Sequence, residues 1–123
     1  MPGSQVSTGA TPSVNPDLKV VHSELVALAI DLDAAIANAR TSSEVNVILD
    51  ELSEVNARVS MVGRQLFTQQ TAKIKTRAEA VLDGIASTKA AIKQLNDIKS
   101  FIQTVTGFLG LVDKLLATAK LVI

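Results

Sequence analysis

Apolar residues recur at alternating intervals of three and four along four separate segments of this chain, and that spacing makes each segment an amphipathic helix. The first segment carries them at Leu18, Val21, Leu25, Leu28, Leu32, Ala35 and Ala39. The second carries them at Val45, Ile48, Leu52, Val55, Val59, Val62 and Leu66. The third runs Ile74, Ala78, Val81, Ile85, Thr88, Ile92 and Leu95, and the last runs Phe101, Val105, Phe108, Val112, Leu115, Ala119 and Val122. Because this alternation is the seam of a coiled coil, we expect four helices that share one core.

Helix-capping residues indicate where these helices begin. Asn15 is followed by a proline and an acid, which suit an N-cap and the first helical turn. Thr41 and Glu44 have the spacing of a capping box, and so do Ser100 and Gln103. The predicted helices cover residues 17–40, 43–67, 71–95 and 97–123.

The join between the second and third segments has two interpretations. The heptad phase breaks after Leu66, and residues 68–73 (TQQTAK) contain neither glycine nor proline. A turn here gives four segments of matched length, as an antiparallel up-and-down four-helix bundle requires. A phase slip inside one helix instead gives three helices, with a long central helix spanning about 43–97. We favour the four-helix bundle, which is mainly α and coiled-coil-like. Its predicted buried seam centres are Leu28, Leu52, Val81 and Val112.

The domain organisation follows from length and local composition. A chain of 123 residues suits one domain. Residues 1–16 hold all three prolines and a run of Ser, Thr and Gly, so we expect a disordered tail followed by one helical domain over residues 17–123. The tail lacks the basic and apolar regions of a secretory signal. We therefore expect a cytoplasmic location by default, with non-classical export left open.

Charge is divided unevenly along the chain, although the formal net charge is zero. Residues 1–60 carry eight acids and three bases, a net charge of −5, and residues 61–123 carry nine bases and four acids, a net charge of +5. We expect the acidic half to pair with the basic half across helix seams. The densest basic cluster is Lys73, Lys75 and Arg77, which is the candidate contact for anionic lipid headgroups or phosphate.

The residue types that carry most enzyme chemistry are missing. There is no cysteine and only one histidine, His22, so thiolate chemistry and cysteine-bound metals are excluded. The paired Glu-x-x-His motifs of di-metal bundles are absent as well. We expect no catalytic, cofactor or metal site, and we expect His22 to be a half-buried histidine beside the first seam. Nucleic acid is not an expected partner, because neither tryptophan nor tyrosine offers a stacking platform.

Polar residues in and beside the seams have structural interpretations. Thr88 interrupts the third seam, and its hydroxyl can bond to the carbonyl four residues back. The acids Glu51 and Glu54 are expected on a solvated helix face, with Arg58 as an intrahelical partner.

The last 23 residues, 101–123, carry only three charges. A membrane-spanning helix needs roughly 20 consecutive apolar residues, and here the uncharged run ends at Val112. A second apolar row lies beside the seam and consists of Ile102, Leu109, Leu116 and Ile123. We therefore expect an amphipathic core helix rather than a transmembrane anchor.

Two functions are compatible with these helices. The first is a non-enzymatic interaction module that forms a homo-oligomer or docks on a helical protein partner. Its predicted interface joins the first and last helices, which are neighbours in an up-and-down bundle. The residues are Val26, Ile30, Leu111, Leu116 and Leu121.

The alternative function is association with a membrane or lipid surface, in which residues 101–123 lie in the interface. In general style, an Ala-, Val- and Leu-rich helical bundle without Trp or Tyr resembles granule-coating phasins and the helical domains of membrane-active, pore-forming toxins. No motif links the chain to either.

Overall fold

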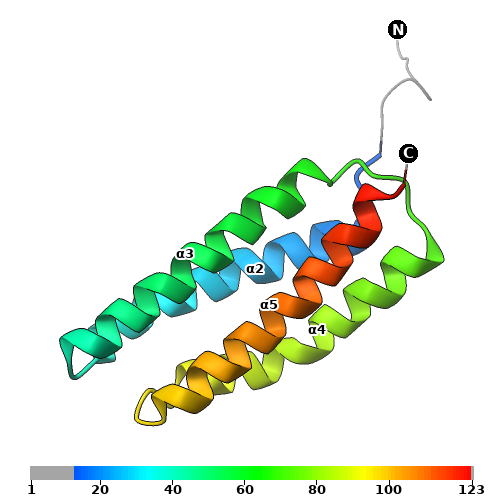
Figure 1. Cartoon of the computed structure of the whole chain (residues 1–123). Coiled ribbons are helices and arrows are strands. Elements are labelled where there is room, and N and C mark those ends of the chain that lie inside the picture. The colour runs from blue at the N-terminus through cyan, green and yellow to red at the C-terminus, as the bar shows by residue number, and fades with distance from the viewer. Residues whose placement is uncertain (1–12, 123) are drawn as a thin grey trace, which may run out of the picture.

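The computed structural model describes residues 13–122, which fold into a bundle of four α-helices (Figure 1). The helices are α2 (Pro16–Ala35), α3 (Ser42–Arg64), α4 (Ala72–Ile92) and α5 (Ile98–Lys120), and a short 3-10 helix, η2 (Ile36–Asn38), follows α2. The predicted four-helix bundle is confirmed, and residues 43–97 form two helices rather than one. Most of the predicted tail over residues 1–16 lies outside the described residues, as does Ile123.

Side-chain caps begin all four helices, and two of them, Asn15 and Thr41, are the predicted residues. Asn15, Thr41 and Thr71 each accept a hydrogen bond from a first-turn N–H group of the helix that follows. At α5 the cap is Asp97, whose carboxylate accepts from the N–H of Ser100 at 3.1 Å. The prediction that Ser100 caps this helix was wrong, because an acid one turn earlier already satisfies the first-turn donors.

The helices are shorter than their apolar patterns. α2 ends at Ala35 and tightens into η2, so the segment up to Arg40 is not continuous α-helix. α3 ends at Arg64, and Phe67 lies in the connection over residues 65–71 with 61% of its surface exposed. Phe67 therefore lies outside the four helices, although the second helix was predicted to extend to residue 67.

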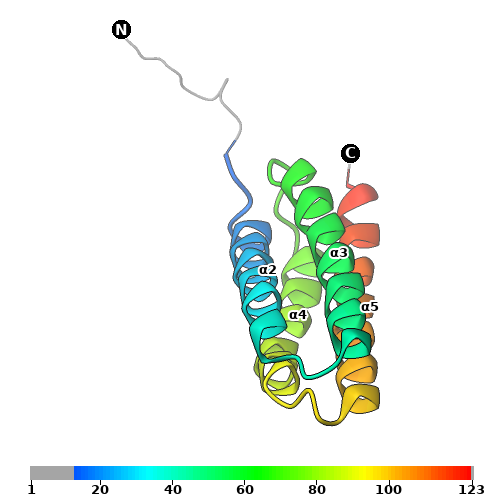
Figure 2. The same ribbon diagram turned by 90° about the vertical axis from the view of Figure 1, so that its left-hand side faces the viewer.

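The order of the helices around the bundle differs from a simple up-and-down ring. α2 packs against α3 and α4, and α5 packs against the same two helices, so α2 and α5 lie on opposite sides of the bundle (Figure 2). The hairpins α2–α3 and α4–α5 thus lie side by side, with α2 parallel to α4 and α3 parallel to α5 (Figure 1). The premise that the first and last helices are neighbours was wrong.

The length of the connection between the hairpins permits this arrangement. Neighbouring helix axes are about 8–10 Å apart, so the diagonal from α3 to α4 is about 14 Å. Residues 65–71 can bridge more than that distance, at roughly 3.4 Å per extended residue. Asn15 fastens this connection, because its N–H donates to the carbonyl of Leu66 at 2.7 Å and its side-chain amide donates to the carbonyl of Thr68 at 3.0 Å.

The helices contribute unequally to the core. α5 buries eight side chains, α2 and α4 bury six each, and α3 buries three. The seam centres Leu28, Val81 and Val112 are buried as predicted, but Leu52 is only half-buried because it faces the groove between α3 and α2. Thr88 is buried and its hydroxyl donates to the carbonyl of Gly84 at 2.8 Å, which confirms the predicted bond within the helix.

Candidate interaction surfaces

The five residues of the predicted interface do not form one patch. Val26 and Ile30 are exposed on α2, which lies across the bundle from α5. Leu111 is half-buried against Gly84 of α4. Leu116 is 3% exposed and belongs to the core together with Leu109 of the same apolar row, whereas Ile102 of that row is exposed. Leu121 is 79% exposed, at the opposite side from α2.

Val26 and Ile30 instead belong to a groove between α2 and α3, which we call the hairpin groove. Its volume is about 450 Å³, and its lining residues are Val26, Ala29, Ile30, Asp33, Leu52, Asn56 and Val59. Ile30 is 63% exposed, and Leu52 and Val59 are half-buried. The seam spacing predicted that both α3 residues are buried in the core, but they are half-buried because this part of the seam faces the groove.

Opposite charges flank Val26 along the outer side of α2, and Asp33 is the one that lines the hairpin groove. Lys19, Val26 and Asp33 follow one another at intervals of seven, which places them on one side of the helix. Neither Lys19 nor Asp33 belongs to an ion pair within residues 13–122. Two other acids of α2 point toward α4, where Glu24 faces Lys89 and Asp31 lies beside Lys89 and Lys93. The hairpin groove is therefore apolar at its centre and carries little net charge.

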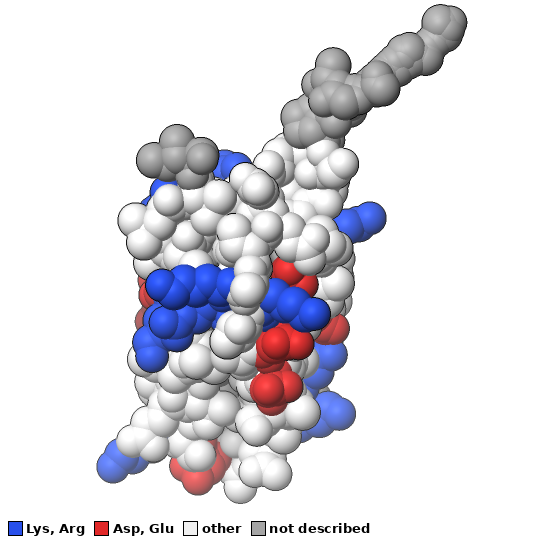
Figure 3. Space-filling model, turned by 90° about the vertical axis from the view of Figure 1, so that its right-hand side faces the viewer, with Lys and Arg blue, Asp and Glu red and all other residues white. Residues whose placement is uncertain are grey.

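A second groove lies where α4 begins and α5 ends, and we call it the basic groove. It has a volume of about 520 Å³, and its lining residues are Thr71, Lys73, Arg77, Lys114, Ala117, Thr118, Leu121 and Val122. Lys and Arg side chains form a band across this face of the molecule (Figure 3). No acid is among the lining residues, so three cations from two helices share the groove.

The predicted basic cluster is only partly preserved in this groove. Lys73 and Arg77 line it, whereas Lys75 does not, because two residues of helix rotate a side chain by about 200°. Lys114 was not predicted as a member. An antiparallel α4–α5 hairpin brings the end of α5 to the start of α4. The predicted antiparallel pairing of these two helices could therefore have identified Lys114 as a neighbour of the cluster.

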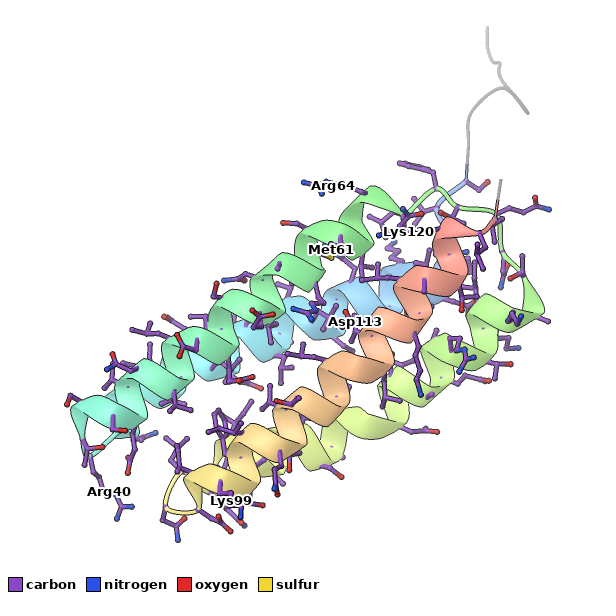
Figure 4. The ribbon with its side chains drawn as sticks, in the orientation of Figure 1. Arg40, Met61, Arg64, Lys99, Asp113 and Lys120 are labelled. Carbon is purple, nitrogen blue, oxygen red and sulfur yellow. The ribbon has the colours of Figure 1, made fainter. Side chains whose placement is uncertain are left out.

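One ion pair crosses each seam between the two hairpins. Arg58 of α3 donates to Asp113 of α5 twice, from Nε to Oδ1 at 3.0 Å and from Nη2 to Oδ2 at 3.1 Å, and it also pairs with Glu54. Figure 4 shows Asp113 on α5 beside α3. Lys89 of α4 approaches Glu24 of α2 at 3.9 Å. In the Lys89–Glu24 pair the base comes from the basic half and the acid from the acidic half, as predicted. In the Arg58–Asp113 pair the base comes from the acidic half and the acid from the basic half, so this pair does not follow the prediction.

Glu51 departs from the solvated position that was expected for it. One of its carboxylate oxygens is buried without a hydrogen-bond partner. Burial raises the pKa of Glu51, the nearby acids Glu54 and Asp50 raise it further, and Arg58 partly offsets them. The intrahelical pairing of Glu54 with Arg58 is present as predicted.

The remaining polar groups within residues 13–122 include one histidine and the acids that lie outside the ion pairs. His22 is half-buried beside Gly63 of α3, as expected for a boundary histidine. No group of three His, Asp or Glu side chains in this range is arranged to hold a metal ion. Helix α5 is long and apolar enough to cross a membrane, a test that the core helix of a soluble protein also passes.

Comparison of the chain with protein-family models, with curated proteins and with solved structures found no match. The two grooves are therefore interpreted from their own residues.

Proposed function

We propose that this protein is a non-enzymatic helical interaction module, and that the hairpin groove docks on the same face of a second copy of the chain. The observation that carries the proposal is the outer side of α2, with Lys19 at one end, Val26 at the centre and Asp33 at the other end.

The shape and spacing of the hairpin groove favour a helix as its occupant. It runs between two antiparallel helices. Its apolar residues are spaced by three and four on α2 (Val26, Ala29 and Ile30) and by seven on α3 (Leu52 and Val59). These are the intervals at which side chains of one helix fit between those of another. Leu49 is exposed on the outer edge of α3 and extends the apolar surface.

The charges favour a second copy over an unrelated helix. When two copies of α2 meet antiparallel about Val26, Lys19 of each copy lies opposite Asp33 of the other. The same contact then forms twice, as a two-fold symmetric interface requires. Because Glu24 and Asp31 face α4, they add little repulsion to this pairing.

The direct test is molar mass by light scattering, with one variant in the hairpin groove and a matched control outside it. Ile30→Glu places a charge in the hairpin groove and should give a folded monomer. Leu121→Glu places the same charge at an exposed leucine on the far side and should stay dimeric. A wild-type monomer at concentrations on the order of tens of micromolar would rule out self-association.

The predicted register has a test of its own. Lys19→Asp should weaken the dimer because it places two acids opposite each other, and Asp33→Lys should weaken it by placing two bases together. The double exchange, Lys19→Asp with Asp33→Lys, restores opposite charges and should recover most of the affinity. Additive losses in the double variant would contradict antiparallel pairing about Val26.

A further inference from the structure

The two ends of the bundle differ in the residues that they expose. The connection end comprises residues 13–15, the connection 65–71 and the last turn of α5, and the hairpin end comprises the turns over residues 36–41 and 93–97. Val14, Phe67 and Leu121 are exposed at the connection end. None of the large apolar side chains that are exposed within residues 13–122 belongs to the hairpin-end turns.

Cations lie directly behind these apolar side chains. The basic groove opens at the connection end, and Leu121 is itself one of its lining residues. Figure 4 shows Arg64 and Lys120 at the same end, while Arg40 and Lys99 lie at the hairpin end. One acid of the first turn of α2, Asp17, also lies at the connection end, where it accepts from the side chain of Gln70 at 3.1 Å.

The three cations that line the basic groove repel one another. Lys73 and Arg77 are four residues apart on α4, a spacing at which like charges destabilise a helix. Lys114 adds a third cation from α5, and none of the three belongs to an ion pair with an acid of the described chain. A bound anion would relieve this repulsion.

The combination points to one kind of partner. Exposed apolar side chains backed by cations match the membrane interface, where apolar groups enter the acyl boundary and cations meet anionic headgroups. We propose that the connection end binds the surface of membranes that contain anionic phospholipids, with headgroup phosphates in the basic groove and Val14, Phe67 and Leu121 inserted beside them.

This mode of binding keeps the bundle closed. The apolar residues of α5 that face α3 and α4 are buried, so inserting the whole helix would require breaking the core. End-on docking uses only side chains that are already exposed. It also leaves the hairpin groove free, so vesicle binding and self-association are independent.

Co-sedimentation with vesicles tests the electrostatic part. Phosphatidylcholine vesicles that contain phosphatidylserine should bind the full chain, and phosphatidylcholine alone should bind it weakly. The triple variant Lys73→Gln, Arg77→Gln, Lys114→Gln should bind the anionic vesicles about 100-fold more weakly. The matched control, Arg40→Gln, Lys93→Gln, Lys99→Gln, removes the same charge from the hairpin end and should retain most of the binding.

Single tryptophans test the orientation, because the chain has none of its own. Fluorescence of the Leu121→Trp variant should shift to shorter wavelength on anionic vesicles, whereas that of Asn96→Trp at the hairpin end should not. Both variants should remain helical by circular dichroism. Equal losses in the two triple variants, equal shifts at the two tryptophans, or no vesicle binding would each overturn the proposal. Binding of inorganic phosphate in the basic groove without vesicle binding would also overturn it.

Discussion

Helices α3 and α5 have the same length and run parallel side by side, yet they use their apolar residues differently. α5 buries eight side chains between α3 and α4. α3 buries only Ile48, Val55 and Val62. Its other large apolar residues are half-buried, as Leu52 and Val59 are along the hairpin groove, or exposed, as Leu49 and Met61 are.

The comparison shows that an apolar sequence does not identify the surface that is free for a partner. α5 has a longer uncharged run than α3, but most of its large apolar residues are buried against α3 and α4, whereas Ile102 is exposed. α3 carries more charge and leaves more apolar surface uncovered. It is attached to the bundle mainly through α2, because the seam between α3 and α5 is the least extensive of the four.

The largest expected effect concerns the core of α5. Phe101 is completely buried, so Phe101→Ala should lower the free energy of unfolding by about 3–5 kcal/mol through lost transfer energy and a cavity. Urea denaturation followed by circular dichroism measures this. A loss below about 1 kcal/mol would mean that α5 is not the principal core helix.

A smaller effect on stability is expected for a residue of α3. Leu52→Ala should cost roughly 1–2 kcal/mol, because Leu52 is half-buried and leaves little enclosed space behind. The measurement is made in the Ile30→Glu background, so that contacts of the proposed dimer do not contribute. Leu28→Ala is the fully buried control and should cost about 2–5 kcal/mol. Equal losses at Leu28 and Leu52 would remove the contrast between α3 and its neighbours.

The Arg58–Asp113 ion pair between α3 and α5 should contribute less to the free energy of unfolding. Arg58→Met keeps most of the aliphatic stem and removes the two hydrogen bonds to Asp113, so a loss of about 1 kcal/mol is expected for this partly exposed pair. Asp113→Asn should give a similar loss, and the double variant should lose little more than either single variant. Additive effects would show that the two side chains stabilise the seam independently.

The smallest expected effect is a gain in stability. Glu51→Gln should raise the free energy of unfolding at pH 7 by less than about 1 kcal/mol, because it removes a partly buried carboxylate with an unpaired oxygen. The pKa of Glu51 is raised above 4.5 in the folded state, so its ionisation costs stability as pH rises through that folded pKa. The advantage of the glutamine should therefore fade as pH falls toward 4.5. An advantage that is independent of pH would show that the carboxylate charge is not its cause.

Local features of the sequence were sufficient for the helices themselves. The three-four spacing identified all four, Asn15 and Thr41 were recognised as caps, and the phase break after Leu66 indicated the turn. These signals act within one or two helical turns, so they do not depend on the rest of the fold. Helix ends were less well predicted, because η2 and the connection over residues 65–71 are fixed by contacts with other segments.

Only the tertiary structure decided which helices are neighbours, and with that the location of both grooves. A heptad seam shows that a helix has an apolar side, but it does not specify which helix that side meets. Leu116 became core and Leu52 became part of the hairpin groove because α5 lies across the bundle from α2. Lys114 joined Lys73 and Arg77 because α4 and α5 form a hairpin. The sequence determined the four helices and their apolar sides, and the packing of those sides determined which residues were left for a partner.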